Sequence, residues 1–377
     1  MSYVVADILK FINDWAPNGT AQSYDNVGLQ VGRPSSTVTK CLVALDLTPA
    51  IVDEAILGGF DTIVTHHPLI FKPISSLTDS GLVPGLALKL AEHKVALVAA
   101  HTNLDAARDG VSFKLGEVLG LQNLEFLSFL EGQVKKVVCF VPVEAVDAVR
   151  QAAHEAGGGQ IGDYSHCSFS SGGTGQFKPG DSTSPFIGQR SGDIEKVSEV
   201  RLEMEVASWR VQHVIKAMRA VHPYQEMAYD LYSVEQPYRD TGIGAIGDLH
   251  VPETLGSFLQ RVSKRLNAQA LKYTGDLNQS VKRVAVCGGS GSDFISLAQK
   301  AGADAYVTAD FTYHRFFETM PLDGSTSMAL IDAGHYETEQ MTEDLLVERL
   351  KKAFPSLFFE KTAHKSSPVH FWTSSDE

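Results

Sequence analysis

The stretch Cys41–His67, CLVALDLTPAIVDEAILGGFDTIVTHH, contains the pattern that decides the fold. The apolar run Cys41–Leu45 predicts a buried strand, Pro49–Leu57 predicts a helix, and Thr62–Val64 predicts a second buried strand. Strands that alternate with helices at this spacing are typical of an α/β layer with mostly parallel pairing. The sequence therefore predicts a parallel sheet covered by helices near the start of the chain.

The same alternation continues downstream and returns near the end of the chain. A helix at Gly85–His93 and a strand at Ala96–Ala100 extend the first stretch, which we place at residues 1–132. A second α/β stretch is expected at residues 237–377, where Thr241–Leu249 (TGIGAIGDL) predicts a turn. Its further expected elements are a helix at Phe258–Leu266, a strand at Val284–Cys287, a helix at Asp293–Ala301, and strands at Ala305–Thr308 and Met328–Asp332. We therefore predict one α/β body interrupted by an inserted domain.

The expected insert covers residues 133–236 and differs from the stretches around it. A strand–helix pattern occurs twice there, as in the ferredoxin-like βαββαβ plan. The expected elements are a strand at Val137–Val141, a helix at Val143–Ala156, a strand at Val200–Val206, a helix at Ser208–Ala220 and a strand at Met227–Tyr232. Between the two halves of this plan lies a long tract, Gly157–Gly192, which is rich in Gly, Ser and Pro and predicts irregular structure.

Composition and charge exclude several classes of protein. Apolar residues make up 44% and charged residues 20% of 377 residues, which is enough to bury sizeable cores. The formal net charge of −13 argues against general nucleic-acid binding, because such a field repels phosphate backbones. No apolar run suits a membrane span, and the N-terminal MSYVVADILKFINDW predicts an amphipathic helix and not a secretory signal. Four widely spaced cysteines predict reduced thiols. We expect a cytoplasmic protein.

Three pairs of residues that could bind a metal, all of them histidines or carboxylates, each follow a predicted strand. They are His66 and His67, His101 and Asp105, and His335 and Glu339. Taken singly, each pair has an ordinary structural explanation: a helix cap, a buried hydrogen-bonded pair, or a solvent-facing pair on one helix face. Ligands of α/β sheets gather at the carboxyl ends of strands, and imidazoles with carboxylates suit zinc, iron or manganese. The repetition therefore favours a metal site.

Two further segments have residue types found in active sites. The loop Gly289–Ser292 lies between a predicted strand and helix, where its amide groups could hold a phosphate or simply form a tight turn. Asp310 and His314 follow another strand, and His314 is a candidate for general acid–base work or a structural histidine. We treat His101 and His314 as candidate catalytic residues.

Motifs along both α/β stretches are similar to those of the NIF-three-like proteins, the GTP cyclohydrolase I type 2 homologues. In family order they are YDNVGLQVG, VTHHPLIF, HTNLD, CGGSGSDF, DAYVTADFTYH and GHYETE, beginning at Tyr24, Val64, His101, Cys287, Asp304 and Gly334. The middle region, with IGDYSHCSFSSGGTGQFKPG and HPYQEMAYD, resembles the PII/CutA-like insert of the longer bacterial members. The resemblance covers essentially the whole chain.

The resemblance implies a fold, an assembly and a ligand set. The fold would be two similar α/β halves, and the assembly a toroidal hexamer, a trimer of dimers, with metal sites facing an inner cavity. One divalent ion would be held by His67, Asp105 and Glu339, and a second by His66, His335 and Glu339, so that Glu339 bridges them.

The implied activity is that of a metal-dependent hydrolase in which activated water attacks a nucleotide ring, as in a GTP cyclohydrolase. A nucleotide or another small anionic molecule would be the ligand. Two alternatives fit the same site. The chain would be either a non-catalytic regulatory protein that responds to metal or nucleotide, or a metal carrier or chaperone.

Overall fold

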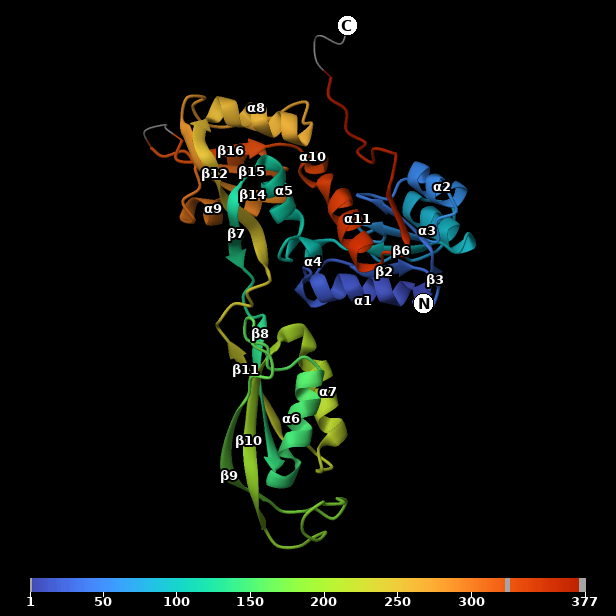
Figure 1. Ribbon diagram of the computed structural model, residues 1–377, viewed down its shortest axis with the longest axis vertical. Coiled ribbons are helices and arrows are strands. Elements are labelled where there is room, and N and C mark those ends of the chain that lie inside the picture. Colours follow the sequence, from blue (N-terminus) through green and yellow to red (C-terminus); the bar gives the residue numbers. More distant parts are fainter. Residues whose placement is uncertain (1, 323–325, 373–377) are drawn as a thin grey trace. The chain divides into compact units, whose positions relative to one another are not determined.

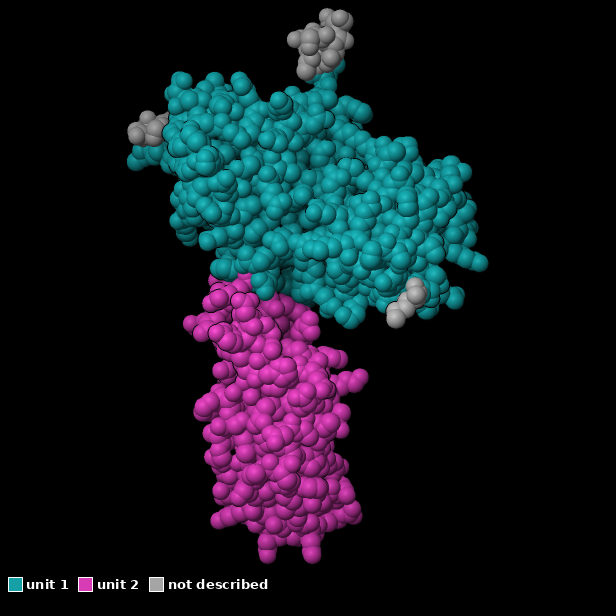
Figure 2. All heavy atoms as spheres, in the orientation of Figure 1, with its two compact units in different colours: residues 1–129, 240–377 teal, residues 130–239 magenta. Residues whose placement is uncertain are grey.

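The structure is a computed structural model that describes residues 2–322 and 326–372. The chain forms two compact units, which Figure 2 shows in different colours. Unit 1 comprises residues 1–129 and 240–377, and unit 2 comprises residues 130–239, so that unit 2 is an insertion in the sequence of unit 1. None of the helices in the described ranges has the length and apolar character needed to cross a bilayer.

The first sheet of unit 1 has five strands in the order β17-β4-β5-β6-β2. The strands β4 (Lys40–Ala44), β5 (Thr62–Thr65), β6 (Ala96–Ala99) and β17 (Phe358–Lys361) run parallel, and β2 (Gly28–Val31) is antiparallel to β6. Every residue of β5 and β6 is buried, as expected for a parallel sheet that is covered on both faces. The predicted parallel α/β layer is thus confirmed.

Helices cover both faces of this sheet (Figure 1). Successive side chains of a strand point to opposite faces, so Cys41 and Val43 pack with α1 (Val5–Trp15) and α11 (Met341–Ala353). On the other face, Leu42 packs with the apolar residues of α2 (Pro49–Leu57) and α3 (Leu82–Glu92). The α1 helix is the N-terminal amphipathic helix predicted from sequence, with Val5, Ile8 and Ile12 buried.

The second sheet of unit 1 has six strands in the order β13-β16-β15-β14-β12-β7. The strands β14 (Ser280–Ser290), β15 (Ala305–Ala309) and β16 (Ala329–Asp332) are parallel, while β7 (Gln122–Phe129), β12 (Gly242–Thr254) and β13 (Lys272–Tyr273) pair antiparallel with their neighbours. The prediction of a turn at 241–249 was wrong, because its backbone pairs on both sides within β12 and its glycines allow close packing. For example, a Cβ on Gly242 would lie 2.4 Å from the ring of Phe126.

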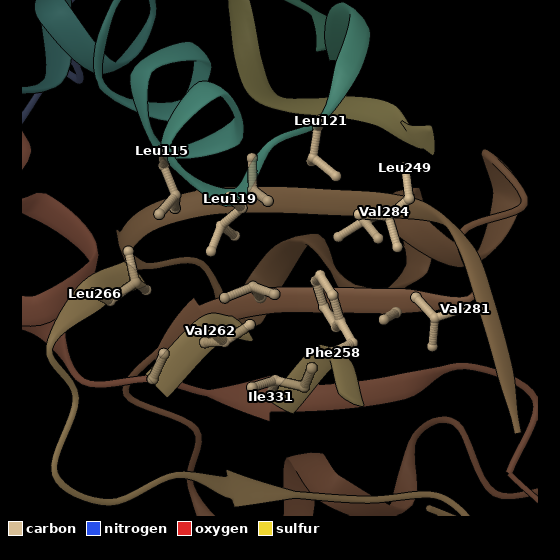
Figure 3. Packing of buried hydrophobic residues seen from close by; sticks show 14 of the residues in the cluster. Leu115, Leu119, Leu121, Leu249, Phe258, Val262, Leu266, Val281, Val284 and Ile331 are labelled. Atoms are coloured by element: carbon tan, nitrogen blue, oxygen red, sulfur yellow. The ribbon is translucent and has the colours of Figure 1, made fainter. Parts of the chain in front are cut away.

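The core of the second sheet is closed by α5 (Val111–Leu119) and α8 (Leu255–Leu266) on one face. Figure 3 shows Phe258, Val262 and Leu266 of α8 packed with Val284 and Ile331 of the sheet. The spacing of 4 residues between the three α8 side chains places them on one face of the helix. On the other face of the sheet lies the short helix α9 (Ile295–Lys300).

Each sheet of unit 1 includes a strand from the other side of the insert in the sequence. β17 near the C-terminus pairs with β4 in the first sheet, and β7 from the N-terminal stretch pairs with β12 in the second. The two sheets therefore do not coincide with residues 1–132 and 237–377. The helices α4 (Thr102–Asp105) and α10 (His335–Glu339) follow strands β6 and β16, one in each sheet.

Unit 2 is an antiparallel sheet in the order β11-β8-β10-β9, with two helices on one face. Along the chain its elements are β8 (Val134–Pro142), α6 (Val146–Glu155), β9 (Phe169–Phe177), β10 (Glu195–Ala207), α7 (Val211–Val221) and β11 (Tyr229–Val234). The strand β9 was not predicted, because its sequence FSSGGTGQF has few residues that favour strands. Its backbone nevertheless pairs with β10 over nine residues.

A buried carboxylate on α11 leads to a prediction about stability. Glu343 is 5% exposed, its Oε1 accepts a hydrogen bond of 2.9 Å from the amide of Leu45, and burial raises its pKa from 4.5 to about 7. The folded chain therefore binds more protons than the unfolded chain between these values, and the free energy of unfolding falls as the pH rises through this window.

We expect Glu343→Gln, which cannot ionise and keeps the acceptor oxygen, to be more stable than the wild type at pH 8. The gain should be roughly 2–3 kcal/mol and should shrink below pH 5. Urea denaturation at several pH values measures this. The control is Glu348→Gln on the same helix, where the side chain is 74% exposed. A gain that does not depend on pH would contradict the assignment.

Candidate metal centre

The five candidate metal ligands lie shortly after strands of unit 1. His66 and His67 follow β5, Asp105 ends α4 after β6, and His335 and Glu339 begin and end α10 after β16. These five side chains approach one another although they come from both sheets. The carboxyl ends of strands in the two sheets therefore face a common site.

Two groups of side chains share the carboxylate of Glu339. In one, Nε2 of His66 lies 3.6 Å from Oδ1 of Asp105 and 3.7 Å from Oε1 of Glu339. In the other, Oε2 of Glu339 lies 3.0 Å from Nε2 of His67 and 3.1 Å from Nε2 of His335. The two nitrogens of His67 and His335 are 3.4 Å apart. Each group offers three ligand atoms to one ion, and Glu339 has one oxygen in each group.

This grouping of side chains differs from the one that the family resemblance implied, in which His67 is expected with Asp105, and His66 with His335. Which residues share a bound ion stays a prediction. In the structure, the Nδ1 atom of His66 is bound to the carbonyl oxygen of Ala100 at 2.7 Å, which turns its ring toward Asp105. The Nδ1 atom of His67 is bound to the carboxylate of Asp46, and its Nε2 atom lies next to that of His335.

Each histidine ring at the site is fixed by a hydrogen bond between Nδ1 and an oxygen atom. The partners are Ala100 for His66 and Asp46 for His67, both at 2.7 Å, Asp310 for His335 at 2.7 Å, and Asp25 for His101 at 2.9 Å. When Nδ1 donates such a bond, Nε2 presents its lone pair, and this is the usual arrangement around a metal-bound histidine. The supporting residues thus orient four Nε2 atoms.

Several polar atoms at this site are buried without a hydrogen bond. They are Nε2 of His66, Oδ1 of Asp105 and Oε2 of Glu339. Glu339 as a whole is only 3% exposed. An unpaired buried polar atom costs about 1–3 kcal/mol, and more for a charged group. The donor set and its orphaned atoms fit divalent cations, since a cation at each group would satisfy all of them.

The charges at the site are strongly coupled. Burial raises the pKa of Glu339, yet the neighbouring imidazoles, that of His335 first, hold it well below its ordinary value. Burial lowers the pKa of His67, but its bonds with Asp46 and Glu339 raise it overall to about 10. Burial raises the pKa of Asp105 to about 7. Without ions, protonated histidines compensate the buried carboxylate, a role that cations would take over.

The structure separates the two candidate catalytic histidines. His101 joins His66 and His67 in a third group of potential ligand atoms, and its ring is oriented by Asp25. Asp25 also accepts a hydrogen bond of 3.1 Å from the amide of Thr102. His314 is exposed on the 3-10 helix Tyr313–Phe317 and joins none of the groups of potential ligands found among the described residues.

The glycines at the end of β14 make room for the shared carboxylate. Gly289 has φ +58°, and a Cβ there would lie 2.2 Å from Oε1 of Glu339 and 3.1 Å from Nε2 of His335. The Gly289 amide donates a hydrogen bond of 3.0 Å to the hydroxyl of Thr338. The amide of Gly289 is therefore not available to hold a phosphate, and this glycine faces the candidate ligands.

Sequence reasoning missed the residues that support the ligands. Asp46 follows β4, and its Oδ2 accepts a hydrogen bond of 2.6 Å from the hydroxyl of Ser366, 320 residues away in the chain. Asp25 lies within the YDNVGLQVG motif, one of those that carry the family resemblance. Both could have been suspected, since Asp46 is a carboxylate directly after a buried strand and Asp25 is acidic in a motif of the family.

We expect Asp46→Ala to weaken the ion at His67, His335 and Glu339 by about 10–100-fold, because the ring of His67 would lose its orientation. Competition of metal-loaded protein with a chelator measures the two affinities. The ion at the other group should be held almost as before. The control is Asp53→Ala, which removes an exposed carboxylate that pairs with Lys89. Equal weakening of both ions, or of neither, would contradict the role of Asp46.

The fold and the site together define an α/β protein with a candidate metal centre at the carboxyl ends of its strands. The sequence profile of the Duf34/NIF3 (NGG1p interacting factor 3) family matches residues 3–368. The chain belongs to this family, which confirms the resemblance seen in its motifs.

Named relatives and a solved structure extend over nearly the whole chain. The GTP cyclohydrolase 1 type 2 homolog of Bacillus subtilis (strain 168) is 39% identical over 337 residues, which is 89% of each chain. The homolog of the same name from Mycobacterium leprae (strain TN) is 40% identical over 343 residues, 90% of this chain and 88% of the relative. A crystal structure of a Bacillus cereus protein related to NIF3 has a TM-score of 0.77 at 37% identity, covering 98% of this chain and 99% of the other.

Proposed function

We propose that the protein is a metal-dependent hydrolase with two divalent ions, of the GTP cyclohydrolase 1 type 2 homolog kind. The observation that carries the proposal is the shared, buried carboxylate of Glu339, with one oxygen in each of two groups of ligand atoms. His66 and Asp105 would complete one group, and His67 and His335 the other. Two bound ions supply a nucleophile from water at neutral pH and polarise the substrate. Zinc, iron and manganese all suit these ligands.

A cavity beside the site gives a substrate room. It has a volume of about 440 Å³, within the usual range for small-molecule sites, and His67 and His335 form part of its wall. Lys272 and Tyr336 also line it, as does Phe371 of the C-terminal segment. Lys272 is already paired with Asp332 at 3.1 Å, so the bound ions would supply the positive charge for an anionic substrate. The aromatic rings would suit a ring-containing substrate such as a nucleotide.

Proton transfer in this proposal falls to His101. Its Nδ1 is held by Asp25 at 2.9 Å, so Nε2 is the atom left to exchange a proton with substrate or water. The rings of His66 and His67 lie 5.2 and 5.3 Å from the ring of His101, and the three histidines form one group of potential ligand atoms. The exposed position of His314 does not support a similar role.

Turnover of GTP by the metal-loaded protein tests the proposal. We expect release of formate and a pterin precursor, and loss of this release in Glu339→Gln but not in Glu337→Gln. Turnover of other phosphoesters or cyclic amides without turnover of GTP would overturn the GTP assignment and keep the hydrolase class. No turnover of any of these substrates by protein that holds two ions would contradict a hydrolase and favour a regulatory protein. Ions lost on simple dialysis against chelator would favour a carrier.

We also propose that unit 2 is a ferredoxin-like domain of the PII/CutA kind and that the chain forms a toroidal hexamer, a trimer of dimers. The order of elements in unit 2, βαββαβ, supports the first part. Exposed apolar side chains on one segment of unit 1, Tyr313, Phe317, Met320 and Leu322, support a subunit interface. Light scattering that shows a monomer would reject the hexamer.

Free thiols support a cytoplasmic location. Cys41, Cys139, Cys167 and Cys287 are all unpaired, and all except Cys167 are buried. Such thiols persist in a reducing compartment.

A further inference from the structure

Unit 2 has a cavity of its own, far along the sequence from any candidate metal ligand. Its volume is about 600 Å³. It is bounded by β9, by β10, by the loop that follows β9 and by residues after α7. Since Leu202 and Met204 of β10 pack under the helices, Glu199 and Arg201 point to the opposite face of the sheet, where they line the cavity.

The cavity has an apolar, aromatic wall. The ring of Tyr224 lies 5.8 Å from the ring of Phe177 and 6.4 Å from that of Phe186, measured between centroids. Phe186 belongs to the loop after β9, which is fastened by a hydrogen bond of 2.9 Å from the amide of Ser184 to Oε1 of Gln225. Three rings around one cavity suit a flat apolar body.

A buried carboxylate lies in this apolar surrounding. Glu199 is 9% exposed, and its one hydrogen-bond partner in the described chain is the hydroxyl of Tyr224, which donates to Oε1 at 2.7 Å. The other oxygen, Oε2, lies only 2.0 Å from where a Cβ of Gly175 would be, so the glycine leaves room for the carboxylate. A buried charge with one neutral partner is costly, and it gains strongly from additional N–H donors.

One glycine of β9 faces the cavity without serving the packing of the chain. Gly173 pairs directly with Glu199 and is on the same face of the sheet, and a Cβ there would meet nothing within 4 Å. Glycine inside a strand costs about 0.5–1 kcal/mol relative to alanine. Because the neighbouring atoms of the chain do not require a glycine here, bare backbone at this position suits the close approach of another molecule.

The charged side chains that line the cavity favour a ligand with hydrogen-bond donors over an anionic ligand. Glu199 and Glu226 both line the cavity, and the guanidinium of Arg201 is already paired with Glu203. Of the basic residues in the lining, this leaves Lys178, which is exposed. An anionic group deep in the cavity would meet the carboxylate of Glu199, whereas N–H groups would satisfy it.

We propose that this cavity binds a small planar ring that carries two adjacent N–H donors, as in the edge of a guanine base or in an aryl amidine. The donors pair with the carboxylate of Glu199, and the ring packs against Phe177, Phe186 and Tyr224. The site shares no residue with the candidate metal centre and goes beyond the hydrolase proposal. Two adjacent donors on one carboxylate form the bidentate geometry that gives strong and directional hydrogen bonds.

Calorimetric titration of the full-length protein, treated with chelator so that the metal centre is empty, tests the site with two probes. These are guanosine, which presents a neutral guanine edge, and benzamidine, which presents a cationic amidine. Binding of either probe supports the proposal, and the tighter probe shows whether the site prefers a neutral guanine edge or a cationic amidine. Inosine lacks the second donor, so it should bind about tenfold or more weakly than guanosine.

Two variants locate the binding. Glu199→Gln should weaken binding about tenfold or more, because it removes the charge that accepts the donors. Glu205→Gln is the matched control on the same strand and face, and it pairs with Lys136 and does not line the cavity. Phe186→Ala removes an exposed loop side chain and should weaken binding without lowering the thermal unfolding temperature.

Three results would overturn the proposal. They are no binding of either probe at millimolar concentration, binding that Glu199→Gln leaves unchanged, and self-association through this face that Phe186→Ala abolishes while the probes do not bind. The last result would assign the cavity to a second copy of the chain.

Discussion

Glu339→Gln should lose both metal ions together. Glu339 is buried and has one oxygen in each group of ligand atoms, at 3.7 Å from Nε2 of His66 and 3.0 Å from Nε2 of His67. The amide is neutral, and it replaces one of the two charged oxygens by a hydrogen-bond donor that repels a cation. One ion would keep two protein ligands, and the other would keep as its third ligand only a neutral carbonyl oxygen, so we expect both affinities to fall by about 100-fold or more.

Metal content measured by mass spectrometry after dialysis against a weak chelator tests this expectation. The matched control is Glu337→Gln, a buried glutamate on the same short helix whose carboxylate lies near Gly334 and Lys365 and not among the ligands. The control should keep both ions. Full retention of one ion by Glu339→Ala, which removes both oxygens, would show that the carboxylate does not bridge.

Gly289→Ala should empty the site while leaving every ligand in the sequence. A Cβ at this position would lie 2.2 Å from Oε1 of Glu339, a contact that requires the carboxylate to move. The backbone at Gly289 also has φ +58°, where an alanine is strained by about 1–2 kcal/mol. We expect loss of both ions together with a lower free energy of unfolding.

A second glycine separates these two effects. Gly302 has φ +72°, and a Cβ there would meet nothing within 4 Å. Gly302→Ala therefore carries the backbone strain without the clash, and it should lower the free energy of unfolding by about 1–2 kcal/mol while keeping both ions. Chemical denaturation and metal analysis of both variants measure the difference. Full metal content in Gly289→Ala would show that Glu339 is not confined as the structure indicates.

The parts of the fold that the sequence predicted are those where buried residues form uninterrupted patterns. β4, β5 and β6 are short apolar runs because a parallel sheet is covered on both faces, and such runs are visible without any knowledge of tertiary structure. β9 was missed because glycine and serine make up most of it, and β12 because its glycines and its proline are typical of turns, whereas backbone hydrogen bonds with neighbouring strands form both.

The exchange of strands between the two sheets could not be predicted for a related reason. β17 pairs with β4 across more than 300 residues, and nothing in the local sequence of Phe358–Lys361 specifies that partner. The helix α11, which precedes β17, packs against the first sheet. These packing contacts form only in the folded chain.

The candidate ligands were predictable, whereas their grouping was not. His66, Asp105 and Glu339 all follow strands, which is a local property of the sequence. Which histidine faces which carboxylate depends on the atoms behind each ring, such as the carbonyl oxygen of Ala100 and the carboxylate of Asp46. These contacts join residues 34 and 21 positions apart, and side-chain orientation at that distance requires the three-dimensional structure.

Anomalous X-ray diffraction from crystals loaded with manganese or zinc tests the central claim most directly. We predict two anomalous peaks about 3.5–4 Å apart, with the carboxylate of Glu339 between them. His66 and Asp105 should contact one ion, and His67 and His335 the other. A single peak, or two peaks of which only one touches Glu339, would contradict the two-ion centre.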